Sequence, residues 1–254
     1  MTLLFRSAVR GVAPGVALLA LGLLPALAGA QSTRPDFLFG VPKASVGLHV
    51  GYAVALASSE VFDFTREQLT VDRSDFDAPA WGISLGIRVA PRVDVTFGVA
   101  RAATSVNSEM RDWVGEDDLP IEQVTDFMRV PVTVGLKAYL RDRGRSIGQF
   151  AWIPRSVSPF VGASAGWVWY RFEQDGEFVD YDTYDIFRER FTQEGRAPTV
   201  HLYGGADWSL SPTFYVTTEG RYQWARADMA GDFVGFDAMD LSGFQATVGL
   251  AVRF

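Results

Sequence analysis

The sequence predicts an all-β protein, an eight-stranded antiparallel transmembrane up-and-down β-barrel, on the strength of three observations. Eight segments alternate apolar residues with small, polar or charged ones, which is the period-two pattern of a strand with two different faces. The connections between these segments alternate between short and long, and aromatic residues gather near the segment ends. Short inner turns, long outer loops and two aromatic rims are typical of barrels that cross an outer membrane.

The first thirty residues have the pattern of a secretory signal peptide. Arg6 and Arg10 lie ahead of the apolar stretch 11–27, and Ala28-Gly29-Ala30 offers a small-residue cleavage site. Two prolines within the stretch argue against an uncleaved spanning helix, which needs about 20 clean apolar residues. We therefore expect residues 1–30 to be removed and residues 31–254 to form the barrel domain.

The eight predicted strands follow one another along the rest of the chain. They span 44–54, 81–89, 92–101, 126–140, 160–172, 200–210, 213–224 and 241–254. Pro131 interrupts the fourth strand and removes one ladder donor, so we expect a bulge or a weakened ladder there. A soluble sandwich or lipocalin-like barrel would also alternate, with its apolar face inward. The small residues of the polar face favour instead a narrow, filled lumen with the apolar face towards lipid.

The connections predict which end of the barrel is which. Residues 91–92 and 211–212 form tight inner turns, whereas 55–78, 105–125, 173–197 and 227–240 are long and should form outer loops. The connection 141–158 departs from this pattern because it is long where a short inner turn is expected. We expect it either to extend its hairpin beyond the membrane or to lie on the inner surface with Phe150 and Trp152 in the interface.

The closing strand carries a resemblance to a known family. It reads Ala-Thr-Val-Gly-Leu-Ala-Val-Arg-Phe over 246–254, and Pro-Phe-Val-Gly-Ala-Ser-Ala-Gly-Trp over 159–167 opens the fifth strand. In these motifs and in its architecture the chain resembles the small outer-membrane β-barrel superfamily of OmpA/OmpX/OmpW-like barrels. The resemblance implies a porin-like protein of the Gram-negative cell envelope, inserted by the barrel-assembly machinery. It also implies that the machinery reads a signal in the last strand, formed by Phe244, Val248, Leu250, Val252 and Phe254.

Polar residues on the inward parity are the candidate functional residues. In so narrow a space, unpaired charges would be very costly, so we expect ion pairs and hydrogen bonds that plug the barrel. A gated path, in which pairs exchange partners, is the alternative. The predicted lumen network consists of His49, Arg88, Asp94, Arg129, Lys137, His201, Asp207, Glu219, Arg221, Gln245 and Arg253.

Composition restricts the possible cofactors and partners. Residues 31–254 contain 21 basic and 30 acidic residues and no cysteine, which argues against nucleic-acid binding and excludes disulfides and thiolate metal sites. The four long connections together carry a net charge of −19. Their acidic residues either keep the loops solvated or share Ca²⁺ or Mg²⁺ with lipopolysaccharide phosphates. The weak metal candidates are Glu116, Asp117, Asp118, Asp175, Asp180 and Asp182; otherwise we expect no cofactor.

Aromatic residues within the long connections suggest a packed loop cap, or a surface that binds a partner or a hydrophobic molecule. The leading expectation is a monomeric, non-enzymatic barrel in the outer membrane, in contact with lipid and lipopolysaccharide, with a structural or envelope-integrity role. Such a barrel could also bind or admit small hydrophobic ligands. An adhesion surface on the acidic loops is one alternative. A lipid-modifying enzyme that uses His49 or His201 is the other, although neither histidine has an evident triad in the sequence.

Overall fold

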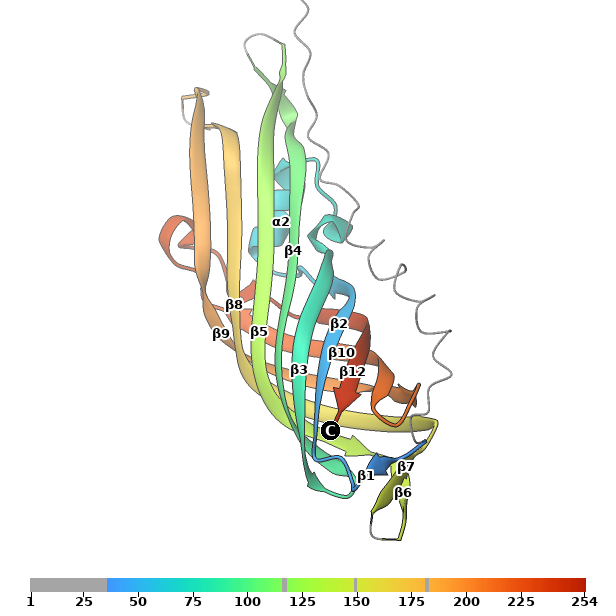
Figure 1. Cartoon of the computed structure of the whole chain (residues 1–254). Coiled ribbons are helices and arrows are strands. Elements are labelled where there is room, and N and C mark those ends of the chain that lie inside the picture. The colour runs from blue at the N-terminus through green and yellow to red at the C-terminus, as the bar shows by residue number, and fades with distance from the viewer. Residues whose placement is uncertain (1–35, 116–117, 149, 181–182) are drawn as a thin grey trace, which may run out of the picture. The chain divides into compact units, whose positions relative to one another are not determined.

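The computed structural model describes residues 36–115, 118–148, 150–180 and 183–254, so the predicted signal peptide 1–30 lies outside the described residues. Figure 1 shows a barrel of long strands with two hairpins that rise above it. The elements are β1 (Leu38–Phe39), β2 (Ala44–Ala55), α2 (Glu60–Gln68), η1 (Arg73–Phe76), β3 (Ala78–Ala90), β4 (Val93–Val114), β5 (Pro120–Tyr139), β6 (Gly144–Ile147), β7 (Ala151–Pro154), β8 (Val157–Val179), β9 (Ile186–Ser209), β10 (Phe214–Ala227), η2 (Gly231–Phe233), β11 (Met239–Asp240) and β12 (Gly243–Arg253).

Eight of these strands form a closed antiparallel ring, in the order β2-β3-β4-β5-β8-β9-β10-β12. The ring closes where β12 pairs with β2 from Gly243↔Ala55 to Arg253↔Ser45. Closure leaves no free edge in the barrel wall, so the backbone N–H and C=O groups of the wall bond to neighbouring strands. The predicted fold class and the eight predicted strands are confirmed.

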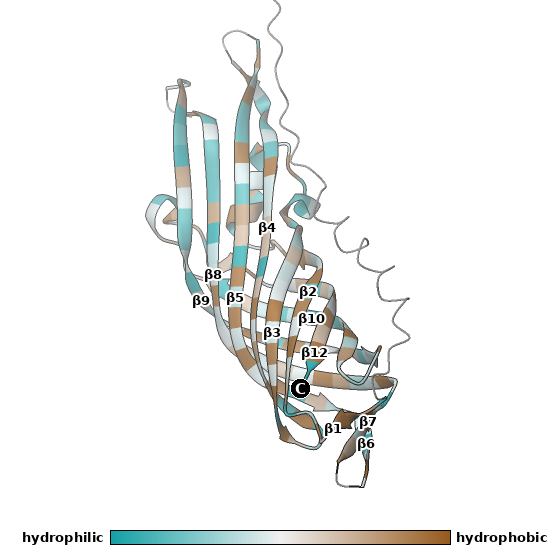
Figure 2. Ribbon diagram, viewed as in Figure 1, coloured by the Kyte–Doolittle hydropathy of each residue, from teal (hydrophilic) through white to brown (hydrophobic). Residues whose placement is uncertain are grey.

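The apolar parity of the strands faces outward. Leu48, Trp81, Val99, Val134 and Leu250 are all exposed on the outer surface of the barrel. Figure 2 shows this as brown bands on the lower strands, while the upper parts of the tall hairpins are largely teal. An exposed apolar surface on a closed barrel is the surface that meets lipid hydrocarbon. No helix among the described residues is both long and apolar enough to span a membrane.

Two of the predicted outer loops are strands instead. β4 and β5 form one hairpin that extends to Val114 and Pro120, and β8 and β9 form another that extends to Val179 and Ile186. The expectation of loops over 105–125 and 173–197 was therefore wrong. In these stretches the strands extend from the lipid into water, so charged residues occupy the positions that are apolar within the membrane. The alternating pattern therefore disappears from the sequence, although the backbone pairing continues.

A hydrophobic core fills the outer mouth of the barrel. Phe62 of α2 lies edge-to-face against Phe76, Phe127 and Phe172, with ring centroids 4.8, 5.4 and 5.6 Å away. Phe233 of η2 contacts Phe172 from the opposite connection. The connections 55–78 and 227–240 thus fold into the mouth as a packed cap, which we call the mouth core. At the hairpin ends, by contrast, the Tyr184 ring is exposed and stacks on Trp113.

The long inner connection folds into a small sheet rather than lying in the membrane interface. β6 and β7 form a hairpin, and β1 joins it by pairing Leu38↔Trp152 and Phe39↔Ala151. Trp152 is only 3% exposed, while Phe150 is largely exposed. Of the two arrangements expected for this connection, the structure has the hairpin and not the interface position of Trp152, because the indole is buried near Arg253.

Pro131 weakens one ladder without shifting its register. Val99 pairs with Val132 and Ala102 pairs with Arg129, so the β4–β5 alignment is the same on both sides of the proline. The ladder lacks the two intervening pairs, as expected where a proline cannot donate. The structure therefore has the weakened ladder and not the bulge.

The mouth core should depend on Phe62 far more than on its neighbour Phe64. Phe62 is fully buried, whereas Phe64 is 44% exposed. Phe62→Ala should destabilise the mouth core by about 3–5 kcal/mol, since it leaves a cavity among three aromatic rings. Hydrogen exchange of residues 58–76 would measure the effect, with Phe64→Ala as the matched control. Equal protection in the two variants would contradict the packing described.

Candidate functional site: the barrel lumen

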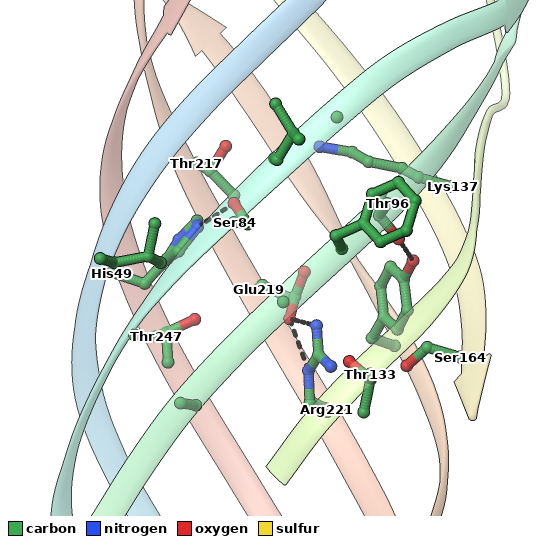
Figure 3. Close-up of a pocket in the computed structure, with 18 of the residues that line it drawn as sticks. His49, Ser84, Thr96, Thr133, Lys137, Ser164, Thr217, Glu219, Arg221 and Thr247 are labelled. Carbon is green, nitrogen blue, oxygen red and sulfur yellow. Dashed lines mark hydrogen bonds and ion pairs between the residues drawn. The ribbon is translucent and has the colours of Figure 1, made fainter. Parts of the chain in front are cut away.

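Below the mouth core, the lumen holds a cavity of about 100 Å³ that is lined by both polar and apolar groups. Figure 3 shows the side chains that line it, including His49, Ser84, Lys137, Glu219 and Arg221, which come from four different strands and point inward. A space of this size holds a few water molecules and not a continuous channel.

The lower part of the lumen is organised around a buried ion pair. The Lys137 ammonium donates to both carboxylate oxygens of Asp207 at 3.0 Å. Asp207 also accepts hydrogen bonds from Tyr139 at 2.8 Å and from Thr217 at 2.6 Å. The Lys137 ammonium lies 3.7 Å from the centroid of the Phe160 ring, which adds a cation–π contact. The structure therefore brings Lys137 and Asp207 together and satisfies both charges.

A second ion pair closes the inner end. Arg143 reaches up from the connection before β6 and donates to Asp94 at 2.8 Å, with its guanidinium over the Tyr139 ring. Arg253 donates to Ser209 at 2.8 Å and stacks over Tyr215. Asp94 and Arg253 were predicted lumen residues, but Arg143 was not. No strand pattern could have indicated it, because it lies outside the barrel strands.

His49 forms a pair that the sequence did not suggest. Its Nε2 atom lies 2.6 Å from the hydroxyl oxygen of Ser84 on the adjacent strand. The imidazole packs against Gly249, its ladder partner, where an added Cβ would lie 2.3 Å from Nδ1 and 2.6 Å from the Leu48 carbonyl oxygen. Glycine is therefore required there. Ser84 lies on the inward-facing side of its strand, and this position in the alternating pattern is the feature of the sequence that could have identified it as a lumen residue.

His201 is held by partners on both ring nitrogens and is 1% exposed. Thr199 donates to the Trp224 carbonyl at 3.1 Å, so its oxygen accepts from His201 Nε2 at 2.9 Å. Arg221 then donates to Nδ1 at 3.2 Å. This pattern fits a neutral imidazole with its proton on Nε2. Arg221 is itself paired with Glu219 at 2.8 Å.

Apart from the two histidines, four predicted lumen residues have no carboxylate partner among the described residues, namely Arg88, Arg129, Gln245 and Arg253. Arg129 donates to the carbonyl oxygens of Leu241 and Ser242, at 3.2 and 3.5 Å, and so ties the wall to the mouth core. Arg88 donates to the Pro91 carbonyl in the inner turn, and Gln245 lines the cavity. The structure thus divides the predicted network into two ion pairs at the inner end, a histidine–arginine–glutamate group in the middle and Arg129 at the mouth.

The other candidate residues lie on the surface. Phe244, Val248, Leu250 and Phe254 are exposed on the outer wall and Val252 is half-buried there. Of the metal candidates, Glu116, Asp117 and Asp182 lie outside the described residues. Asp175 pairs with Arg190, and Asp180 accepts from the Thr183 amide. Across the described residues, Asp118 included, no three carboxylate, histidine or cysteine groups come close enough to hold a metal ion.

Known structures share this fold at low sequence identity, whereas no family model and no curated sequence matches the chain. OprG of Pseudomonas aeruginosa, an outer membrane protein, is 13% identical, covers 85% of this chain and 99% of its own, and has a TM-score of 0.47. The attachment invasion locus protein Ail of Yersinia pestis is 10% identical, covers 84% and 99%, and has a TM-score of 0.45. Neisserial surface protein A is 11% identical, covers 87% and 98%, and has a TM-score of 0.43.

The closed ring, the outward apolar surface and the exposed tryptophans near both ends together define an outer-membrane β-barrel. The chain is therefore a bacterial outer-membrane protein in architecture and location.

Breaking the buried Lys137–Asp207 pair should cost more than breaking an exposed pair. Lys137→Met leaves an unpaired buried carboxylate and should destabilise the barrel by about 3–5 kcal/mol. Adding Asp207→Asn should recover most of that loss, because the buried charge is then removed as well. Arg171→Met breaks the exposed Arg171–Glu194 pair and should cost less than about 1 kcal/mol. Urea unfolding in lipid vesicles measures all three, and similar losses in both single variants would refute the assignment.

Asp240, at the outer mouth above the spanning segments, should make the mouth core sensitive to acid. Burial alone would raise its pKa, but hydrogen bonds from Ser58 at 2.5 Å and from the Ser242 amide at 2.9 Å outweigh burial and lower the pKa. A lowered folded-state pKa stabilises the protein above the usual pKa of about 3.9, and this contribution disappears as pH falls through the folded value.

Thermal unfolding from pH 7 to pH 2 tests this. The wild type should exceed Asp240→Asn in stability above about pH 5, and the difference should shrink towards pH 2. Asp228→Asn, at an exposed site, provides the control and should track the wild type throughout. A wild-type advantage that grows with acid would contradict the sign.

Proposed function

We propose that the chain is a non-enzymatic outer-membrane barrel, closed to solutes, with a structural role in the cell envelope. The observation that carries this proposal is that folded structure occupies both ends of the lumen. The mouth core fills the outer end, and Trp152, Arg143 and Arg253 fill the inner end. Between them, Lys137 pairs with Asp207 and Arg221 pairs with Glu219 around a cavity of about 100 Å³.

The same geometry favours a structural role over the admission of small hydrophobic ligands. The cavity is lined by an ammonium, a guanidinium, carboxylates and hydroxyls, and an apolar ligand would have to desolvate all of them. Its volume is also below the roughly 300–1,000 Å³ of typical ligand sites.

The absence of enzymatic activity is part of the proposal and has its own support. Ser84 and His49 resemble a nucleophile and its base, but a triad also needs an orienting acid and a path for substrate. The described contacts place no carboxylate within hydrogen-bond distance of His49, and the pair lines the lumen cavity rather than the lipid-facing surface. Lipid A mass spectra from cells with and without the protein should be identical, and a modified species that requires Ser84 would refute this part.

Planar-bilayer recording tests the closed lumen. The purified, reconstituted protein should show no steady conductance, because two seals lie in series along the lumen. Removing one seal, by Trp152→Ala with Arg143→Ala or by replacing residues 58–76 with a Gly/Ser linker, should leave the other in place. Combining both changes should produce openings. Protection of the barrel from protease confirms insertion, and a large steady conductance of the wild type would overturn the proposal.

A further inference from the structure

The outward face of the barrel carries tryptophans and arginines close together at its outer rim. Trp167 and Trp169 of β8 are exposed there, and their ladder partners on β9 are Pro198 and Arg196. Arg196 is exposed as well, and its guanidinium carbon lies 5.4 Å from the centroid of the Trp167 ring. This cation–π contact holds the guanidinium in place and leaves its planar N–H groups available for a second partner.

A second arginine extends this surface onto the next strand. The ladder between β9 and β10 ends at Ala225↔Thr199, and the same register continued by one residue places Arg226 beside Pro198. Arg226 is therefore a diagonal neighbour of Arg196, a relation that corresponds to about 7–8 Å along a sheet. Arg226 is exposed, and the residues on either side of it in the chain are buried, so its side chain faces outward.

This surface lies where the wall changes from apolar to charged. Below it, Val200 and Leu202 are exposed on the outward face of β9, and Trp224, the ladder partner of Val200, is exposed beside them. Above it, Arg171 and Glu194 form an exposed ion pair at 2.7 Å. Such a change marks the boundary between hydrocarbon and headgroups, where tryptophan is enriched. We define the rim patch as Trp167, Trp169, Trp224, Arg196 and Arg226.

The positive charge of the rim patch is not neutralised by the fold. Neither of its arginines has an ion-pair partner in the part of the chain that the structure describes. Two neighbouring carboxylates are engaged elsewhere. Glu194, two residues before Arg196, pairs with Arg171. Asp240, the ladder partner of Arg226, is buried and accepts hydrogen bonds from two serines. The patch is therefore complementary to an anion that comes from outside the chain.

Charge and depth together select a phosphorylated lipid. We propose that the rim patch binds lipopolysaccharide of the outer leaflet, with a lipid A phosphate at Arg196 and Arg226 and the acyl chains along the apolar wall below. Guanidinium groups bind phosphate oxygens in a bidentate manner. A phosphate monoester carries close to two negative charges at neutral pH, which matches two arginines better than the single charge of a phospholipid diester. Free phosphate has no acyl chains and would gain nothing from the wall.

This proposal concerns the outer wall and goes beyond the closed barrel, so either can fail without the other. Native mass spectrometry of the folded protein in detergent micelles tests it, with bisphosphorylated lipid A as the probe. Arg196→Gln with Arg226→Gln should weaken binding about tenfold, as expected for the loss of two charge-assisted contacts. The matched control, Arg141→Gln with Arg145→Gln, removes the same charge from two exposed arginines at the inner end and should bind like the wild type. A heat-dependent shift in gel mobility confirms that each variant is folded.

Further probes separate lipid A from other sources of phosphate. Lipid A without its phosphates should bind the wild type as weakly as intact lipid A binds the Arg196/Arg226 variant. Arg196→Lys keeps the charge but loses the planar guanidinium, and should weaken the binding of intact lipid A severalfold. Phosphatidylglycerol should bind the wild type more weakly than lipid A. Equal weakening in variant and control, equal binding of phosphatidylglycerol and lipid A, or displacement of lipid A by an equal concentration of inorganic phosphate would each overturn the proposal.

Discussion

Closure of the backbone ladder between β12 and β2 is the constraint from which the rest of the structure follows. Lipid hydrocarbon offers no partner for a free N–H or C=O group, so a membrane sheet is stable only when its last strand bonds to its first. In this chain the final strand pairs with β2 along its whole length, up to Arg253↔Ser45. With eight strands, that closure also makes the lumen narrow.

The narrow lumen explains the chemistry inside the barrel. Every second side chain of a strand points into the lumen, where a charged group needs a hydrogen-bonding or ion-pair partner within a few ångströms. Asp207 accordingly receives Lys137, Tyr139 and Thr217, and His201 has a partner on each nitrogen. Groups that look catalytic one at a time are, in this setting, parts of a hydrogen-bonded polar core. The same requirement draws Arg143 in from outside the strands.

Outside the membrane the constraint changes. Water satisfies strand edges, and the sheet above the membrane needs its own apolar support. The mouth core supplies it, with Phe62 against three aromatic rings of the wall and of η1. The same core closes the outer end of the lumen. Support for the hairpins and closure of the barrel are thus one feature.

The sequence by itself determined the number of membrane strands, their inward and outward faces and most of the lumen residues. Period-two alternation is a local property, and it survives in any segment that lies between lipid and lumen. Only the tertiary structure decided the rest. In the extended hairpins, charged residues take the place of the apolar residues, so the alternation does not reveal these strands. Arg143 reaches the lumen from a turn, and Ser84 contacts His49 only when β2 and β3 pair. Each of these depends on which strands become neighbours, and alternation along one strand carries no information about that.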